Sequence, residues 1–319
     1  MTSLKKLERD RAASDLAAVD AMISRLGDED ALTRLSLEQR RDEIRQELEK
    51  IEDRGEPTAS AVLFFTGRPV IGQRGVESEF AGRAVTTFQE LVTKQYAHDA
   101  GVLGQRGPLP NRAGTRLHIT NIARGSFGFQ FEEITDQSPL LASALKAAVE
   151  HATELMAAFG EDEEGRFEAA VENVDSRVLD SARDFFSLMR QDGATFRIVS
   201  GETDRSFDIA SIERAAQRAS VTTISDVQEE QEGQLAGVLP QAHLFEYRTE
   251  GPRGVIRGKV AREILADELA RYNHAWVDKP RIASLLVRQV LKEDQVVRES
   301  FTLVGVRERP IGLHLAGLN

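Results

Sequence analysis

The chain contains no cysteine among its 319 residues. Disulfide bonds, cysteine-ligated zinc, iron–sulfur clusters and thiol catalysis are therefore excluded. Long apolar runs are missing too: no window approaches the roughly 20 apolar residues that a membrane-spanning helix needs. The N-terminus, "MTSLKKLERDRAASDL", has no apolar segment of signal-peptide length. These absences predict a soluble, cytoplasmic protein.

An excess of basic residues is also lacking. The net charge is −11, and residues 1–234 carry 28 basic and 42 acidic side chains, whereas residues 235–319 carry 13 and 10. A protein that binds nucleic acids without sequence preference usually has a basic excess over a whole domain, because phosphate neutralisation supplies its affinity. The charge distribution therefore disfavours a protein that binds nucleic acids without sequence preference, although it is compatible with a local basic patch.

The length and composition indicate a globular protein of several domains. Hydrophobic residues make up 41% and charged residues 29% of the chain, which exceeds the size at which one core usually stops growing. The pattern predicts an α+β, multi-domain fold in four parts. These are a helical hairpin (1–55), a small α/β domain with glycine- and arginine-bearing loops (57–135), an acidic helical segment with a short strand (136–220), and a small SH3-like or OB-like β-barrel with an inserted helix (221–319).

Two amphipathic helices begin the chain. Apolar residues at helical spacing predict helices over about 4–26 and 36–53, the second starting at Ser36 with Gln39 three residues on, as in a capping box. Each helix has too narrow an apolar stripe to be stable alone. The stripes either pack within the chain or form a dimerising coiled coil, although they cover fewer heptads than a convincing coiled coil has. The more specific hypothesis is that the chain forms a homo-oligomer through residues 4–53.

A strand, a loop and a helix then follow in a pattern that resembles a phosphate-binding loop. The apolar run 59–66 predicts a buried strand, and 77–97 predicts a helix. Gly67 and Gly72 between them have P-loop spacing. However, Gln73 and Arg74 stand where lysine and serine or threonine are needed, and proline at 69 removes one N–H donor. We therefore interpret the glycines as structural.

Arginines are concentrated in the loops of this second part. Residues 54–124 carry nine basic and five acidic side chains. Arginines on loops can converge on a phosphate or carboxylate, because the guanidinium fork binds two oxygens at once. They can also form ordinary ion pairs or contact a partner. The candidates for an anionic ligand or a partner are Arg68, Arg74, Arg106, Arg112 and Arg124.

The stretch "NIARGSFGFQFEEI" (121–134) predicts the corner of a β-hairpin. Phenylalanines at 127, 129 and 131 alternate to one face and should enter the core. Gly128 lies on the opposite face and would allow the backbone of another segment to come close. Of this stretch, only Arg124 at the turn is left as a candidate contact.

Residues 138–191 carry two helical patterns, the first starting at Ser138–Pro139. Thirteen acids and three bases lie between Glu132 and Asp180. They form either a solvated face or a docking surface for a basic partner. A strand over 194–201 and a helix over 208–220 follow.

Five strand-like segments and one helix (262–272) inserted after the third predict the barrel of the last part. The segments are 234–240, 243–250, 254–261, 281–291 and 296–306. Its aromatic residues either fill the barrel or stack on nucleic-acid bases beside basic side chains. The residues proposed for its binding surface are Tyr247, Arg248, Arg257 and Trp276.

No catalytic or metal-binding motif is present. The six histidines lack metal spacing, and Ser126 lacks the glycine two residues earlier that a nucleophile elbow requires. We therefore expect no cofactor and no metal. The leading hypothesis is a non-enzymatic interaction protein, an oligomeric accessory or sensor subunit of a larger bacterial complex such as an antiviral defence or toxin–antitoxin system. The alternatives are a nucleic-acid or nucleotide-binding module and an enzyme whose site assembles only in three dimensions.

Overall fold

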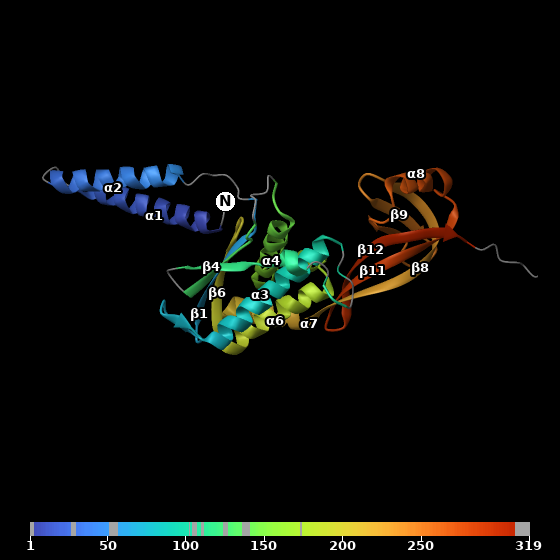
Figure 1. Cartoon of the computed structure of the whole chain (residues 1–319). Helices are drawn as coiled ribbons and strands as arrows, with labels where there is room; N and C mark the ends of the chain where they lie inside the picture. The colour runs from blue at the N-terminus through green and yellow to red at the C-terminus, as the bar shows by residue number, and fades with distance from the viewer. Residues whose placement is uncertain are drawn as a thin grey trace, which may run out of the picture. The chain divides into compact units, whose positions relative to one another are not determined.

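A computed structural model describes residues 3–26, 30–50, 57–101, 103, 107–109, 112–123, 127–135, 141–172 and 174–309 (Figure 1). The chain is mixed α and β and falls into two compact units, residues 1–220 and 221–319. The finer division of the first unit into three parts stays a prediction. Among the described helices, none is long and apolar enough to cross a bilayer.

The first unit starts with two helices, α1 (Ser3–Arg25) and α2 (Ala31–Lys50), which pack against each other. The first helix has nearly the predicted bounds. The second begins five residues before Ser36, so the predicted capping box at Ser36 is wrong. The α1 helix also contacts strand β1 (Ser60–Gly67).

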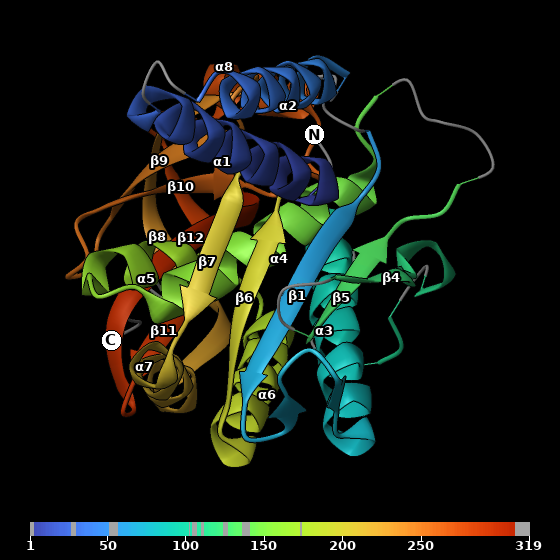
Figure 2. The ribbon, with the colours of Figure 1, turned by 90° about the vertical axis from the view of Figure 1, so that its left-hand side faces the viewer.

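A five-stranded sheet follows, in the order β4-β5-β1-β6-β7 with every neighbouring pair antiparallel. Its other strands are β4 (His118–Ala123), β5 (Phe127–Glu132), β6 (Ala194–Ser200) and β7 (Thr203–Phe207). Figure 2 shows α3 (Ser78–Asp99), α4 (Ala144–Gly160) and α6 (Ser176–Asp192) on one face of the sheet, and one end of α1 contacts β1 from the other face.

Phenylalanine rings fill the space between the sheet and these helices. The ring of Phe65 on β1 lies 5.4 Å from that of Phe80 on α3, and Phe196 stacks on Phe207 at 4.3 Å. The predicted hairpin strand contributes Phe131, which lies against Phe88. These rings bury large apolar areas, which supply most of the stabilisation of such a core.

Several element bounds differ from the prediction. The second helical pattern is two helices, α5 (Glu164–Val171) and α6, because Asp175 caps a new start by accepting from the Arg177 N–H. The α4 helix begins at Ala144 with Ser143 as its N-cap, whereas Ser138 and Pro139 lie outside the described residues. The strand and helix predicted over 194–201 and 208–220 are confirmed as β6 and α7 (Ile209–Val221).

The second unit is a ring of five strands in the order β10-β12-β11-β8-β9. The ring closes because β10 pairs with β9 on one side and with β12 on the other. Its elements are β8 (Thr222–Leu239), β9 (Leu244–Thr249), β10 (Val255–Val260), α8 (Ala266–Ala275), β11 (Pro280–Lys292) and β12 (Gln295–Glu308). The inserted helix starts four residues later than predicted.

Candidate functional site

The glycine loop after β1 uses its backbone donors internally. It contains a small hairpin of β2 (Val70–Ile71) and β3 (Gly75–Val76), and the Arg74 N–H donates to the Ile71 carbonyl at 2.9 Å. The Arg68 N–H donates to the Gly193 carbonyl, and the Glu77 N–H donates to the Pro69 carbonyl. Gly67 has a φ of +94°, a backbone conformation that favours glycine, so a structural role for this residue has support. These N–H groups are not directed at an anion.

The loop arginines do not converge on one pocket among the described residues. Arg68 donates to the Gln191 carbonyl at the end of α6, whereas the loop at Gly107 accepts from Arg177 in the first turn of α6. These ends of a 17-residue helix lie about 24 Å apart at 1.5 Å per residue. Arg74 and Arg112, the latter in the short 3-10 helix η1 (Arg112–Thr115), are exposed. Arg106 and Arg124 lie outside the described residues.

The hypothesis of an enzyme whose site assembles in three dimensions requires its candidate side chains, Arg68, Arg74, His98 and His118, to gather in one cleft, and they do not. Arg68 lies beside the start of α3, and His98 is in its last turn, roughly 30 Å away along the helix. His118 pairs with Glu132, which pairs with Ser60 at the opposite end of β1 from Arg68. Among the described residues, no three His, Asp or Glu side chains gather closely enough to hold a metal ion.

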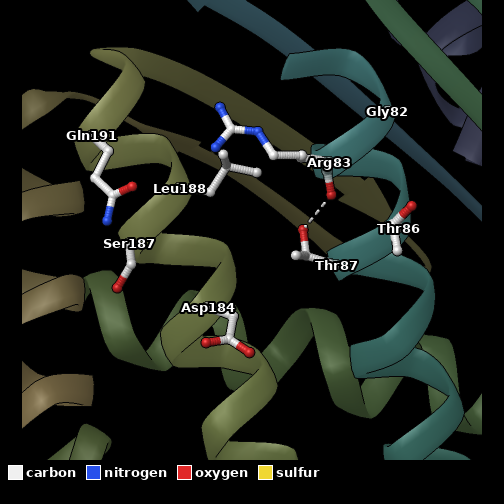
Figure 3. Close-up of a pocket in the computed structure, with 8 residues that line it drawn as sticks. All are labelled: Gly82, Arg83, Thr86, Thr87, Asp184, Ser187, Leu188 and Gln191. Atoms are coloured by element: carbon white, nitrogen blue, oxygen red, sulfur yellow. Dashed lines mark hydrogen bonds between the residues drawn. The ribbon is translucent and has the colours of Figure 1, made fainter. Parts of the chain in front are cut away.

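A groove that the sequence did not predict runs between α3 and α6 (Figure 3). Its volume is about 400 Å³. Arg83 extends from α3 toward α6 and pairs with Asp192 at 2.6 Å. The lining residues are Gly82, Arg83, Thr86, Thr87, Asp184, Ser187, Leu188 and Gln191.

The groove offers hydrogen bonds and charges of both signs, but its lining holds no histidine that could activate Ser187. The pKa of Asp184 is raised, chiefly because neighbouring protein atoms displace water from the carboxylate, and Lys94 opposes this effect. The Thr87 hydroxyl is already used, since it donates to the Arg83 carbonyl at 2.9 Å. The groove therefore resembles a shallow surface depression more than a catalytic centre.

The acidic segment is partly neutralised by arginines of β7 and α7. Arg205 pairs with Glu161, Arg214 with Asp162, and Arg218 with Glu164. From the sequence, these acids are either solvated or partner-binding. These three ion pairs connect the segment after α4 to β7 and α7 within the same unit, while acids such as Glu154 and Glu168 are exposed. A solvated face and a docking surface both stay predictions for the exposed acids.

The four residues proposed for the surface of the C-terminal unit lie in different environments. Tyr247 is not on the surface: it is fully buried, and its hydroxyl lies within hydrogen-bond distance of the carbonyls of Gln231 and Arg281. Trp276 stacks on Tyr272 and lies under the guanidinium of Arg281. The ring is therefore already engaged by two neighbours of its own unit and is half-buried, so base stacking on it has no support.

The basic candidates of the same unit already have acidic partners. Arg248 lies 3.2 Å from Asp278, and Arg257 lies 2.8 Å from Glu246. Both pairs are exposed, so a phosphate would compete with a carboxylate at each of them.

Arg253 connects three strands of the ring. It lies in the turn between β9 and β10, pairs with Glu229 on β8 at 2.5 Å and with Glu299 on β12 at 3.0 Å, and lies over the ring of Phe301. The hydrogen bond from Arg253 lowers the pKa of Glu229 below its ordinary value.

Replacing Arg253 should destabilise the ring in a pH-dependent way. Because the pKa of Glu229 is lowered in the folded state, the pair stabilises the protein above the unfolded pKa of about 4.3 and loses this effect as the pH falls through the folded pKa. We expect Arg253→Met to lower the free energy of unfolding by about 2 kcal/mol near neutral pH and by much less at acidic pH below the folded pKa of Glu229.

The measurement is urea unfolding followed by the fluorescence of Trp276, the one tryptophan of the chain, which lies in this unit. The matched control is Arg257→Met. The side chain of Arg257 is 75% exposed, so its replacement should change the free energy of unfolding by close to zero. An equal loss for Arg253→Met at neutral and acidic pH would contradict the role of the ion pairs.

Comparison with known protein families, curated proteins and solved structures finds no match to this chain. The function must therefore be inferred from the chain's own surfaces.

Proposed function

We propose that this chain is a non-enzymatic interaction and assembly protein, an accessory or sensor subunit of a larger bacterial complex, and that the α1–α2 hairpin binds a second copy. The observation that carries this proposal is the exposure of large apolar side chains beside the loop that joins the two helices. Met22 is 55% exposed, Leu32 85% and Leu35 64%. We call these three residues the hairpin tip.

The hairpin buries little of its own apolar surface. Among its described side chains, only Ala12 and Ile44 are buried, and Leu16, Val19 and Ile23, which lie on the apolar stripe of α1, are half-buried. A second hairpin would cover these residues in a four-helix arrangement. Because both copies offer the same surface, such a contact is isologous and closes as a dimer.

Two finer points belong to the same proposal. The ring of the second unit would be a small barrel, SH3-like or OB-like, that carries a further protein contact. The nucleic-acid alternative has less support, because the arginines proposed for it in this unit are paired with carboxylates.

The test is sedimentation velocity on the full chain over a range of concentrations. We expect self-association in which the dissociation constant of the hairpin contact rises at least about tenfold in the double variant Leu32→Gln/Leu35→Gln, since this change removes apolar contact from the hairpin tip. Point variants are preferable to deleting the hairpin, because α1 contacts β1 and its removal would expose the sheet.

The matched control is Leu141→Gln, which changes an equally exposed leucine (82%) outside the hairpin and should leave the dissociation constant unchanged. A strict monomer at every concentration would contradict the proposal. An equal effect of Leu141→Gln would show that the hairpin tip is not the contact.

A further inference from the structure

We propose that β4 is a second self-association surface, at which the β4 strands of two copies pair antiparallel about a two-fold axis. β4 lies at one edge of the five-stranded sheet, and among the described strands it pairs with β5 alone, on its inner side. An edge strand presents a row of backbone N–H and C=O groups that another strand can pair with.

The two edges of this sheet differ in how they are protected. The opposite edge, β7, carries Asp204 and Arg205 and is paired through them with Arg197 and Glu161. Charged side chains on an edge disfavour strand addition. The sequence of β4, "HITNIA", contains no lysine, arginine, aspartate or glutamate. This contrast makes β4 the less protected edge by charge. One of its backbone donors, the Ile122 N–H, already donates to the side-chain oxygen of Asn121 at 2.8 Å, so pairing at that position has to replace this bond.

A bulge brings two isoleucines of β4 to one face. Thr120 and Asn121 lie together opposite Gln130, so Ile119 pairs with Phe131 and Ile122 pairs with Phe129. Without the bulge, residues three apart would point to opposite faces. Both isoleucines are exposed, Ile119 by 46% and Ile122 by 54%.

The strand is complementary to itself in one register. A two-fold axis between Thr120 and Asn121 places Ile119 opposite Ile122 of the second copy, and Ile122 opposite Ile119. Four isoleucines then form one apolar cluster on a shared face, while the polar residues of the two bulges meet on the other. An unrelated peptide would need to supply this pattern, whereas a second copy supplies it by symmetry.

This surface is distinct from the hairpin tip. A chain with two different isologous contacts builds assemblies larger than a dimer. The β4 contact stands or fails independently of the hairpin contact, because the two involve different residues.

The absence of cysteine makes a register-specific test direct. In the double variant Ile119→Cys/Ile122→Cys, opposed residues would have Cα atoms about 4.5–5.5 Å apart, within the range that a disulfide bridges. In either single variant, the two cysteines would lie roughly 8 Å apart, beyond the range that a disulfide bridges, since the bulge leaves them two pairing positions out of register. We expect a disulfide-linked dimer from the double variant under mild oxidation and none from the single variants.

Collisional cross-linking is controlled by Leu265→Cys, an exposed position of the other unit. Absence of the cross-link in the double variant, or equal cross-linking in a single variant or in the control, would overturn the proposed pairing.

An equilibrium measurement completes the test and separates the two contacts. In the Leu32→Gln/Leu35→Gln background, Ile122→Arg should raise the remaining dissociation constant at least about tenfold, because it places like charges at the contact. Its circular dichroism spectrum should be unchanged, because the side chain is exposed. A background variant that is already monomeric would overturn the β4 contact and leave the hairpin contact standing. Unchanged association in both variants would overturn both contacts.

Discussion

Gly258→Ala should lower the free energy of unfolding of the C-terminal unit by at least about 3 kcal/mol. A Cβ atom at this position would lie 2.1 Å from the Phe301 carbonyl oxygen, which is backbone and cannot move aside. The φ of Gly258 is ordinary, so the cost is a steric one between two strands.

The effect is large because the ring closes over a short contact. β10 pairs with β12 at Lys259–Thr302 and Val260–Leu303, followed by a hydrogen bond from the Ala261 N–H to the Leu303 carbonyl at 2.9 Å. Separating these strands to admit a methyl group would open the ring at its narrowest connection.

Urea unfolding followed by Trp276 fluorescence measures this loss in the C-terminal unit. The control is Gly305→Ala on β12, where a Cβ would meet no atom within 4 Å. Because alanine also restricts the unfolded chain, this control should leave stability unchanged or slightly raised. Equal stability of the two variants would show that the strands do not approach as closely as the structure indicates.

Glycines illustrate what the sequence can and cannot predict. The alternation of phenylalanines around Gly128 predicts a strand with one buried face, and β5 confirms the strand. The sequence predicts that another backbone comes close to Gly128. A Cβ atom there would lie 3.1 Å from the Leu63 carbonyl oxygen but only 2.6 Å from the ring of Phe64, so the nearest neighbour is a side chain. The tight approach at Gly258 has no sequence signal, because it depends on Phe301, which is far away along the chain.

Strands rich in charged residues are a second feature that the sequence predicts poorly. The sequence predicts a strand only over residues 234–240, whereas β8 starts at Thr222. Its first half, "TTISDVQEEQEG", is rich in acids and lacks apolar alternation. The partner strand provides the reason that it is extended: Asp226 accepts both hydrogen bonds of the Arg288 fork from β11. Asp226 and Arg288 are far apart along the chain, so no pattern of neighbouring residues predicts this pairing.

The candidate site is the part that the sequence predicts least well. Chemistry is expected where arginines and glycines cluster, yet those loops bond to their own neighbours at opposite ends of α6. The surfaces that carry the proposals are apolar residues left exposed, and exposure depends on tertiary packing. Ile119 and Ile122 resemble ordinary strand residues in the sequence, and only the sheet order places them at an edge.

Arg218→Met should destabilise the first unit by about 3 kcal/mol, because it removes a buried charge while keeping most of the apolar stem. Arg218 is 7% exposed and donates to the carbonyls of Phe159 (3.1 Å) and Glu161 (2.5 Å) and to the Glu164 carboxylate (2.7 Å). The carbonyls at the end of α4 have no partner within the helix, so the guanidinium supplies what the helix end lacks.

The matched control is Arg214→Met, one turn earlier on α7. Arg214 donates to the Gly160 carbonyl at 2.9 Å and pairs with the exposed Asp162, so its loss should cost about 1 kcal/mol or less. Amide hydrogen exchange in α4 and α7 measures the effect, because Trp276 reports only the other unit. Equal protection from exchange in Arg218→Met and Arg214→Met would contradict the effect of burial. A third variant, Arg218→Lys, separates the charge from the guanidinium fork, because lysine keeps the charge but cannot reach all three acceptors at once. We expect its loss of stability to lie between those of the other two variants.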